Sequence, residues 1–105
     1  MAEHATVVRV TRFHPLPVKH AELVVRLQSG VAAMRTADGC FGVQLCSVRE
    51  APDSVAVISR WANQAALDKV LSAGMMDINV IKDLITSPPA SEHLIPVAGG
   101  SGPDD

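Results

Sequence analysis

The segment Ser-Val-Ala-Val-Ile-Ser-Arg-Trp, in the middle of the chain, constrains the fold more than any other. Its β-branched residues predict a β-strand. Side chains alternate between the two faces of a strand, so Val55, Val57 and Trp61 share one face. Ala56 and Ile58 lie on the other face. Because a strand that is apolar on both faces needs cover on both, we expect helices over one face of the sheet and a second subunit over the other.

Three further apolar runs predict the other strands of the sheet, at residues 5–13, 40–48 and 94–97. The connection 49–53 reads Arg-Glu-Ala-Pro-Asp and is rich in turn-forming residues. Residues 40–48 and 54–61 should therefore pair antiparallel as a hairpin. The proline within the last run cannot donate a ladder hydrogen bond, so that strand should occupy an edge or contain a bulge.

Apolar residues at helical spacing predict an amphipathic helix over residues 18–35. Its apolar stripe consists of Leu23, Leu27, Val31 and Met34. Asn63 can cap a second helix that stops near Gly74. A third, short helical stripe runs over residues 76–85, where two prolines end it.

The order of these elements, βαββααβ, predicts an α+β fold of ferredoxin-like type, with an antiparallel sheet and helices on one face. With 105 residues the chain is long enough for one domain, which we expect at residues 1–98. Residues 99–105 are polar and glycine-rich, and we expect them to be a disordered tail. Hydrophobic residues make up 48% of the chain, which is high for a lone small domain and favours a homodimer.

The charge pattern excludes two classes of partner. The net charge is −2, and acidic and basic residues are interspersed, so we expect neither nucleic acid nor a membrane surface as a partner. The first residues lack the charged and apolar regions of a signal peptide, and we predict a cytoplasmic protein. Cys40 and Cys46 fall about 20 Å apart on one predicted strand, at ~3.3 Å per residue, too far for a disulfide.

Known cofactor and metal motifs are absent from the sequence. The four histidines have no metal-ligand spacing, and the chain has no glycine-rich phosphate loop and no Cys-x-x-Cys pair. We therefore predict no metal and no cofactor.

A small-residue turn, Gly39-Cys40-Phe41-Gly42, precedes the hairpin that ends at Arg60-Trp61, and Ala65-Ala66-Leu67 opens the next helix. This pattern resembles the antibiotic biosynthesis monooxygenase family of dimeric α+β barrels, over most of residues 5–98. The resemblance implies that the sheets of two subunits pack into a barrel. It also implies a cavity between sheet and helices, lined by the tryptophan that matches Trp61.

Trp61 and Thr11 are the candidate catalytic residues. An indole offers a flat apolar plate and one N–H donor that together can orient an aromatic substrate, although Trp61 can equally fill the core. Thr11 lies on the face of the first strand that also carries Arg9. The family's haem-degrading branch has an asparagine at what resembles this position, and threonine keeps a hydroxyl there. The alternative is that Thr11 is simply a good strand former.

The candidate substrate-binding residues are Arg9, His14, Phe41, Val57 and Ser59. Arg9 could pair with an anionic group, and His14 at the end of the first strand could act as a base at a cavity mouth. Val57 and Ser59 share the strand face of Trp61, where the Ser59 hydroxyl could bind substrate.

Two functions are compatible with these residues. The resemblance implies a cofactor-independent monooxygenase that oxidises a small electron-rich aromatic or quinol substrate. The alternative is a non-catalytic dimeric barrel that binds a small apolar ligand or haem. The haem-degrading branch supplies a histidine to the iron where this chain has Val70 and Leu71, which disfavours haem degradation by that arrangement.

Overall fold

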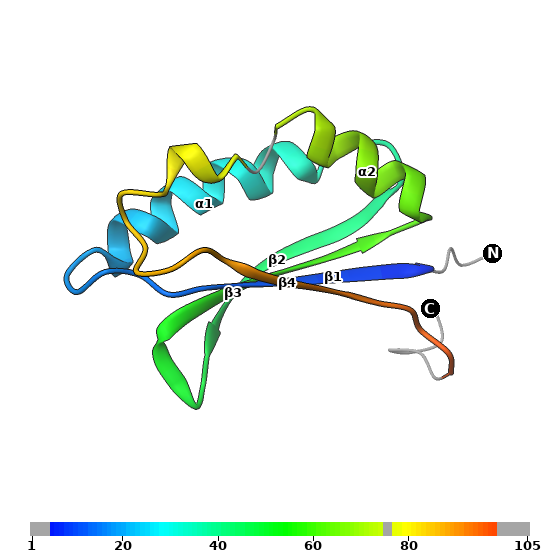
Figure 1. The fold of residues 1–105 in the computed structure, drawn as a ribbon. Helices are drawn as coiled ribbons and strands as arrows, with labels where there is room; N and C mark the ends of the chain where they lie inside the picture. Colours follow the sequence, from blue (N-terminus) through cyan, green and yellow to red (C-terminus); the bar gives the residue numbers. More distant parts are fainter. Residues whose placement is uncertain (1–4, 75–76, 99–105) are drawn as a thin grey trace.

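The computed structural model describes residues 5–74 and 77–98, which form an antiparallel sheet covered by helices on one face (Figure 1). The strands are β1 (Val7–Phe13), β2 (Cys40–Val48), β3 (Ala51–Trp61) and β4 (Ala90–Leu94). The helices are α1 (His20–Met34) and α2 (Gln64–Ser72), followed by the short 3-10 helix η1 (Ile78–Val80).

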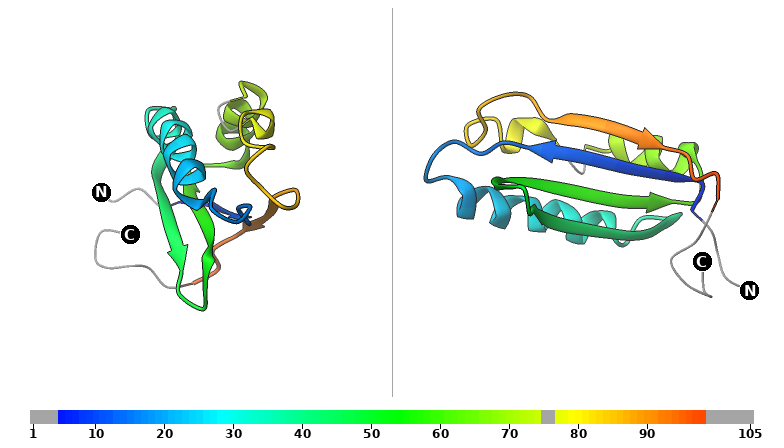
Figure 2. Two further views of the ribbon diagram at one scale, coloured as in Figure 1. Left: turned by 90° about the vertical axis from the view of Figure 1, so that its left-hand side faces the viewer. Right: turned by 90° about the horizontal axis from the view of Figure 1, so that it is seen from below.

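The strand order across the sheet is β2-β3-β1-β4. All neighbouring pairs are antiparallel, and the four strands lie side by side when the sheet is viewed from below (Figure 2, right). The end-on view places the helices in a second layer above the sheet (Figure 2, left). This arrangement confirms the predicted ferredoxin-like α+β fold.

The register of β1 on β3 confirms the predicted division of faces. Val7 is paired with Trp61 and Thr11 with Val57, so these side chains share one face. This face meets the helices, because Val57 and Trp61 are both 2% exposed or less and belong to the core with Leu23 of α1. The core therefore lies between the sheet and the helices.

The opposite face of the sheet carries apolar side chains that no element among the described residues covers as a layer (Figure 1). Ala56 and Val8 are buried, and Val10 and Ile58 are half-buried. These four residues lie on the central strands β1 and β3. We call them the far-face cluster.

The helical stripe predicted over residues 76–85 is mostly a turn. Only η1 is helical there, and Asp77 caps it by accepting a hydrogen bond from the Asn79 backbone N–H at 2.9 Å. The buried side chains of Ile81 and Leu84 nevertheless belong to the core. The apolar spacing in the sequence therefore comes from a turn that packs on the core, and not from a helix. Met76, where the stripe begins, lies outside the described residues.

Two strand boundaries also differ from the prediction. The last strand is β4, which ends at Leu94, and Ile95 and Val97 beyond it are exposed. Pro96 explains this end, since it cannot donate to a ladder. As predicted, the strand occupies an edge, where it pairs with β1 alone.

β3 begins at Ala51, which shortens the hairpin connection to residues 49–50. The predicted tail, 99–105, lies outside the described residues.

Gly39 fixes the contact between the start of β2 and the start of α2. Its φ of +81° lies in the left-handed region, and a Cβ on this residue would stand 2.7 Å from the Cβ of Ala66. The Gly39 carbonyl accepts a hydrogen bond from the Ala62 N–H at 2.8 Å, and Asn63 caps α2 through the Ala66 N–H at 2.9 Å. The small residues noted in the sequence thus allow the backbone and helix to pack closely.

Candidate functional site

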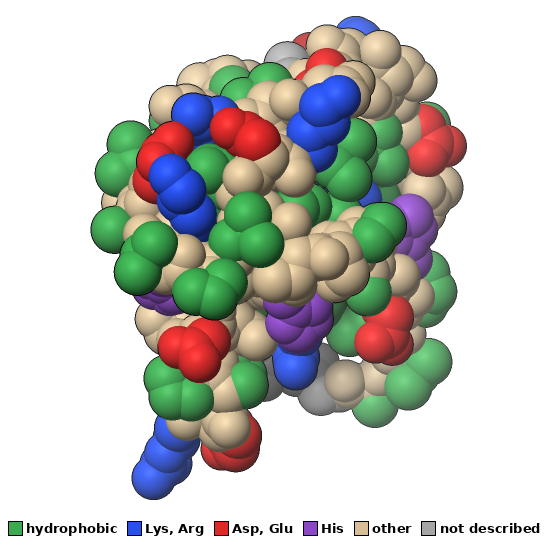
Figure 3. Space-filling model, turned by 60° about the vertical axis from the view of Figure 1, so that its left-hand side comes forward, with side chains coloured by type: hydrophobic (Ala, Val, Ile, Leu, Met, Phe, Trp, Pro, Cys, Tyr) green, Lys and Arg blue, Asp and Glu red, His purple; other side chains and the backbone are tan. Residues whose placement is uncertain are grey.

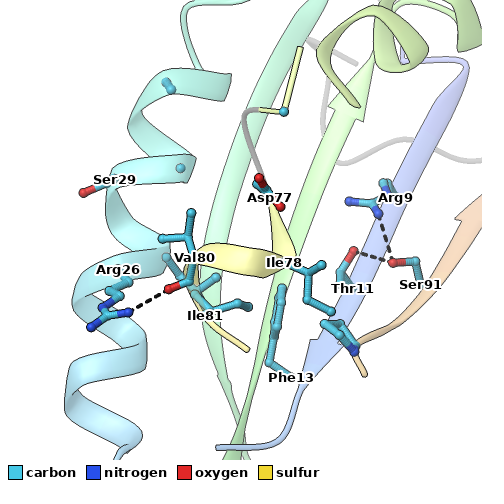
Figure 4. Close-up of a pocket in the computed structure, with 15 residues that line it drawn as sticks. Arg9, Thr11, Phe13, Arg26, Ser29, Asp77, Ile78, Val80, Ile81 and Ser91 are labelled. Carbon is cyan, nitrogen blue, oxygen red and sulfur yellow. Dashed lines mark hydrogen bonds between the residues drawn. The ribbon is translucent and has the colours of Figure 1, made fainter. Parts of the chain in front are cut away.

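A pocket of about 400 Å³ lies between α1, the segment around η1, and strands β1 and β4 (Figure 4). Much of its wall is apolar. Phe13 of β1, Leu27 of α1 and Ile81 are buried residues that line it, and Ile78 and Val80 of η1 line its more exposed part. Its volume is at the small end of the ~300–1,000 Å³ range typical of small-molecule sites.

Polar side chains gather on the side of the pocket that β1 and β4 form. The hydroxyls of Thr11 and Ser91 are 2.9 Å apart and share a hydrogen bond, and Arg9 Nη2 donates to Ser91 Oγ at 3.1 Å (Figure 4). The register explains this arrangement, because Thr11 is paired with Ser91 across the β1–β4 ladder. We call Arg9, Thr11 and Ser91 the donor cluster.

Arg9 is a half-buried cation without a carboxylate partner among the described residues. Its Nε–H is buried and has no hydrogen-bond acceptor there. Burial lowers the pKa of Arg9, because desolvation disfavours the charged form. The guanidinium is still a cation at neutral pH, since arginine loses its proton only under strongly alkaline conditions.

The other charged residues of the pocket are already engaged. Arg26 donates to the Val80 carbonyl at 2.7 Å and pairs with Glu22 at 2.8 Å and Asp83 at 3.5 Å, which ties η1 to α1. Asp77 is exposed and caps η1. Arg9 is therefore the charged group of the described pocket that has neither a salt bridge nor a capping role.

The comparisons with known proteins agree with this architecture. The family model described as antibiotic biosynthesis monooxygenase matches residues 6–76, which is more than half of the chain. The chain belongs to the antibiotic biosynthesis monooxygenase family. No curated protein matches it.

Several solved structures share this fold at low sequence identity. Rv0793 from Mycobacterium tuberculosis is 24% identical, with a TM-score of 0.80 over 90% of this chain and 98% of that one. PA3566 from Pseudomonas aeruginosa is 18% identical, with a TM-score of 0.78 over 93% and 100% of the two chains. A structure described as an antibiotic biosynthesis monooxygenase is 15% identical, with a TM-score of 0.78 over 88% and 99%. At these identities the likeness supports the fold alone.

Among the residues predicted for the site, the structure places Arg9 and Thr11 in the pocket wall. Trp61, Val57 and Ser59 share their sheet face but do not line the pocket, because they are fully buried in the core. The indole N–H of Trp61 donates to Ser59 Oγ at 2.8 Å. In this chain the tryptophan is therefore part of the core and not of the pocket wall, and its polar group is already bonded.

His14 and Phe41 lie away from the pocket. His14 is exposed just past the end of β1, where its Nδ1 is 3.1 Å from Ser54 Oγ. Phe41 is 37% exposed and sits where the register of β2 on β3 shifts between Cys40 and Gly42. Such an irregularity interrupts the regular alternation of side chains, so strand periodicity alone does not predict where Phe41 points.

Sequence reasoning missed Ser91 and Asp77. Ser91 belongs to β4, and placing the last strand at 94–97 removed it from consideration. The prolines at positions 89 and 96 bracket the true strand and are the signal that could have found it. Asp77 precedes η1 as a cap, and a capping aspartate does not by itself indicate a ligand.

Charge on the molecular surface is mixed. On the face in Figure 3, Lys and Arg side chains lie among Asp and Glu side chains and form no patch of one sign. Within the described part of the chain no helix is long and apolar enough to cross a membrane. The same residues contain no cluster of histidine, cysteine and carboxylate groups suited to a metal ion.

Proposed function

We propose that this protein is a cofactor-independent monooxygenase that oxidises a small electron-rich aromatic or quinol compound in the pocket. The observation that carries the proposal is the donor cluster on one side of an otherwise largely apolar pocket. Hydrogen-bond donors held in place in a site with little water stabilise an oxyanion strongly. An aromatic hydroxyl that loses its proton there becomes electron-rich enough to react with oxygen.

The chemistry needs only the substrate and O₂. The substrate anion transfers one electron to O₂, and the resulting substrate radical and superoxide combine to form a carbon–oxygen bond. The peroxide then loses water and leaves a carbonyl, so one oxygen atom enters the product and the other leaves as water with two substrate hydrogens. The protein contributes orientation, exclusion of water and stabilisation of the anion.

The pocket residues can divide these tasks. Thr11 and Ser91 would hydrogen-bond the substrate oxyanion, and Arg9 would supply positive charge beside it. Asp77 is the carboxylate that lines the described pocket and would accept the hydroxyl proton. Trp61 would act as a positioning residue that holds β3 in place, because it is buried in the core and is paired with Val7 of β1.

Oxygen uptake tests this proposal. Purified protein is mixed with dihydroxynaphthalene or anthrone under air, and oxygen consumption and the quinone product are followed. We expect Thr11→Val to lower the rate at least about tenfold, as for loss of an oxyanion donor. Thr36→Val is the control, since Thr36 is exposed after α1 and bonds only the Ala33 carbonyl. A wild-type rate equal to that of buffer would contradict the proposal.

The second candidate is a dimeric barrel that binds a small apolar ligand without catalysis. It is favoured by the composition of the pocket wall, in which the described residues include neither histidine nor cysteine. Tight binding of naphthol without oxygen uptake would support it. If the ligand of this non-catalytic barrel is haem, adding haemin should give a shifted Soret band.

We further propose that the far-face cluster packs against the same cluster of a second copy. Val10 and Ile58 are half-buried and lie beside the buried Val8 and Ala56 at the centre of the sheet. A sheet of this kind needs cover on the face opposite its helices. A second sheet, packed face to face, would supply it and form the barrel implied by the sequence resemblance.

A further inference from the structure

We infer that the ligand of the pocket is a carboxylic acid, whose carboxylate binds the donor cluster while its flat apolar body lies against Phe13, Ile78 and Ile81. The inference rests on the proposed function, because it names the substrate class of the same pocket. It goes beyond that function, because an electron-rich aromatic compound need not carry an acid group.

The donor cluster has more free donors than free acceptors, because the Arg9 guanidinium carries five N–H groups and accepts no hydrogen bond. Thr11 and Ser91 carry one hydroxyl hydrogen each, and one of these two is used in the bond between them. Ser91 Oγ also accepts from Arg9 Nη2. Whichever hydroxyl donates to the other, one hydroxyl hydrogen stays free for a ligand. The cluster is therefore suited to a ligand that accepts hydrogen bonds.

Arg9 adds a donor that the described part of the chain does not satisfy. Its Nε–H is buried without an acceptor, and a buried donor that stays unpaired is unfavourable. The acidic residue of β4, Glu92, cannot relieve it from its place in the sheet. Glu92 is paired with Val10 and lies on the opposite face. Arg9 therefore keeps its charge without a carboxylate partner among the described residues.

The charge of Arg9 distinguishes a carboxylate from a neutral acceptor. A half-buried guanidinium is stabilised most by an opposite charge, and a neutral amide or ketone would satisfy the hydrogen bond but not the charge. The planar guanidinium presents several N–H donors in one plane, a geometry that matches two carboxylate oxygens. Asp77, the carboxylate among the described residues of the pocket wall, forms no salt bridge with Arg9.

The rest of the pocket sets the shape of the acid. Phe13 and Ile81 are buried apolar surfaces, and Gly30 and Ala33 of α1 leave room between the helix and the sheet. Arg26 is neutralised by Glu22 and Asp83 and does not compete for the ligand's charge. The pocket has a volume of about 400 Å³ and carries the charge of Arg9, which no salt bridge neutralises among the described residues, at one end only. A small fused-ring acid fits this shape.

Calorimetry with naphthoate and naphthamide tests the inference, because the two compounds have nearly the same shape and differ in charge. We expect wild-type protein at pH 7.5 and low salt to bind naphthoate at least tenfold more tightly than naphthamide. Arg9→Gln should reduce that preference to about one. Arg49→Gln, which removes the same charge from the exposed β2–β3 turn, should keep the wild-type preference. Ser91→Ala, on the exposed edge strand, should weaken the preference for naphthoate severalfold. This variant tests the inference if Arg9→Gln does not fold.

The outcomes separate the inference from the proposed function. Equal affinities for acid and amide in wild-type protein, or a full preference in Arg9→Gln, would overturn the inference even if dihydroxynaphthalene is oxidised. An Arg9-dependent preference for the acid would support it even if no compound consumes oxygen. If both hold, dihydroxynaphthoate should be oxidised with a lower KM than dihydroxynaphthalene, and Arg9→Gln should remove that difference.

Discussion

The indole Nε1–H of Trp61 donates a hydrogen bond to Ser59 Oγ at 2.8 Å, and both side chains are buried to 1% exposure or less. The two residues are neighbours on one face of β3, so the strand itself brings donor and acceptor together. The single tryptophan of the chain therefore has its polar group satisfied inside the core. It needs no ligand to complete its hydrogen bonding.

This bond predicts that Ser59→Ala lowers the free energy of unfolding by about 1–3 kcal/mol, because the buried indole N–H loses its acceptor. Urea unfolding followed by tryptophan fluorescence measures the change. Ser47→Ala, an exposed serine of β2, is the control and should change stability little. Trp61→Phe should lose stability, followed by far-UV circular dichroism because this variant has no tryptophan, yet keep the naphthol affinity of wild-type protein. A specific loss of affinity in folded Trp61→Phe would show instead that the indole contacts ligand.

The sequence was sufficient to predict the division of the sheet into faces. Val57 and Thr11 meet across β1 and β3 because strand alternation is strict, and the register then follows from the hairpin and the apolar pattern. The pocket was harder to predict, because Ser91 enters it through an edge strand of exposed residues with no apolar pattern. Trp61 was difficult for a different reason. Strand alternation places the Trp61 side chain on the face that the helices cover. Only the three-dimensional packing decides whether that side chain lines the pocket or is enclosed in the core.

Gly39→Ala should destabilise the protein by roughly 2 kcal/mol, because two penalties combine. A φ of +81° is unfavourable for alanine, and the new Cβ would meet Ala66 Cβ at 2.7 Å. Gly42→Ala is a matched control in the same turn-and-strand segment, where an added Cβ has no atom within 4 Å. Thermal and urea unfolding of both variants check the difference. Equal effects would show that the contact between β2 and α2 is not tight.

Val18→Asn should stabilise the protein by about 0.5–1 kcal/mol. Val18 has a φ of 60°, a strained conformation for a β-branched residue, and its side chain is 97% exposed, so its replacement forfeits almost no packing. Asparagine tolerates this conformation better. Val25→Asn is the control, because Val25 is exposed within α1 and its backbone is helical. The urea midpoint should rise for the first variant and fall slightly for the second.

Cys40 should react slowly with iodoacetamide at neutral pH. Burial raises the pKa of its thiol, an effect only partly opposed by a hydrogen bond with the Gly42 backbone and by the charge of Arg35. Since the folded-state pKa exceeds the unfolded one, this thiol contributes stability below the unfolded pKa and loses it as pH rises through the folded pKa. Alkylation of a Cys46→Ser variant between pH 7 and 10 should therefore follow a midpoint above that of a free cysteine peptide. A midpoint at or below the peptide's would contradict the prediction.

The proposed packing of two far-face clusters predicts that Ile58→Glu converts a dimer into separate protomers. Ile58 is half-buried in the far-face cluster, and a carboxylate there would have to be desolvated against apolar side chains of the second copy. Wild-type protein should sediment as a dimer at micromolar concentration, and the variant should sediment at half that mass with its far-UV circular dichroism unchanged. Val25→Glu introduces the same charge on the exposed side of α1, in the other layer, and should stay dimeric. A wild-type protein that sediments as a single protomer would show that the far face is not the interface, and the apolar cover that β3 requires would then have to come from another partner.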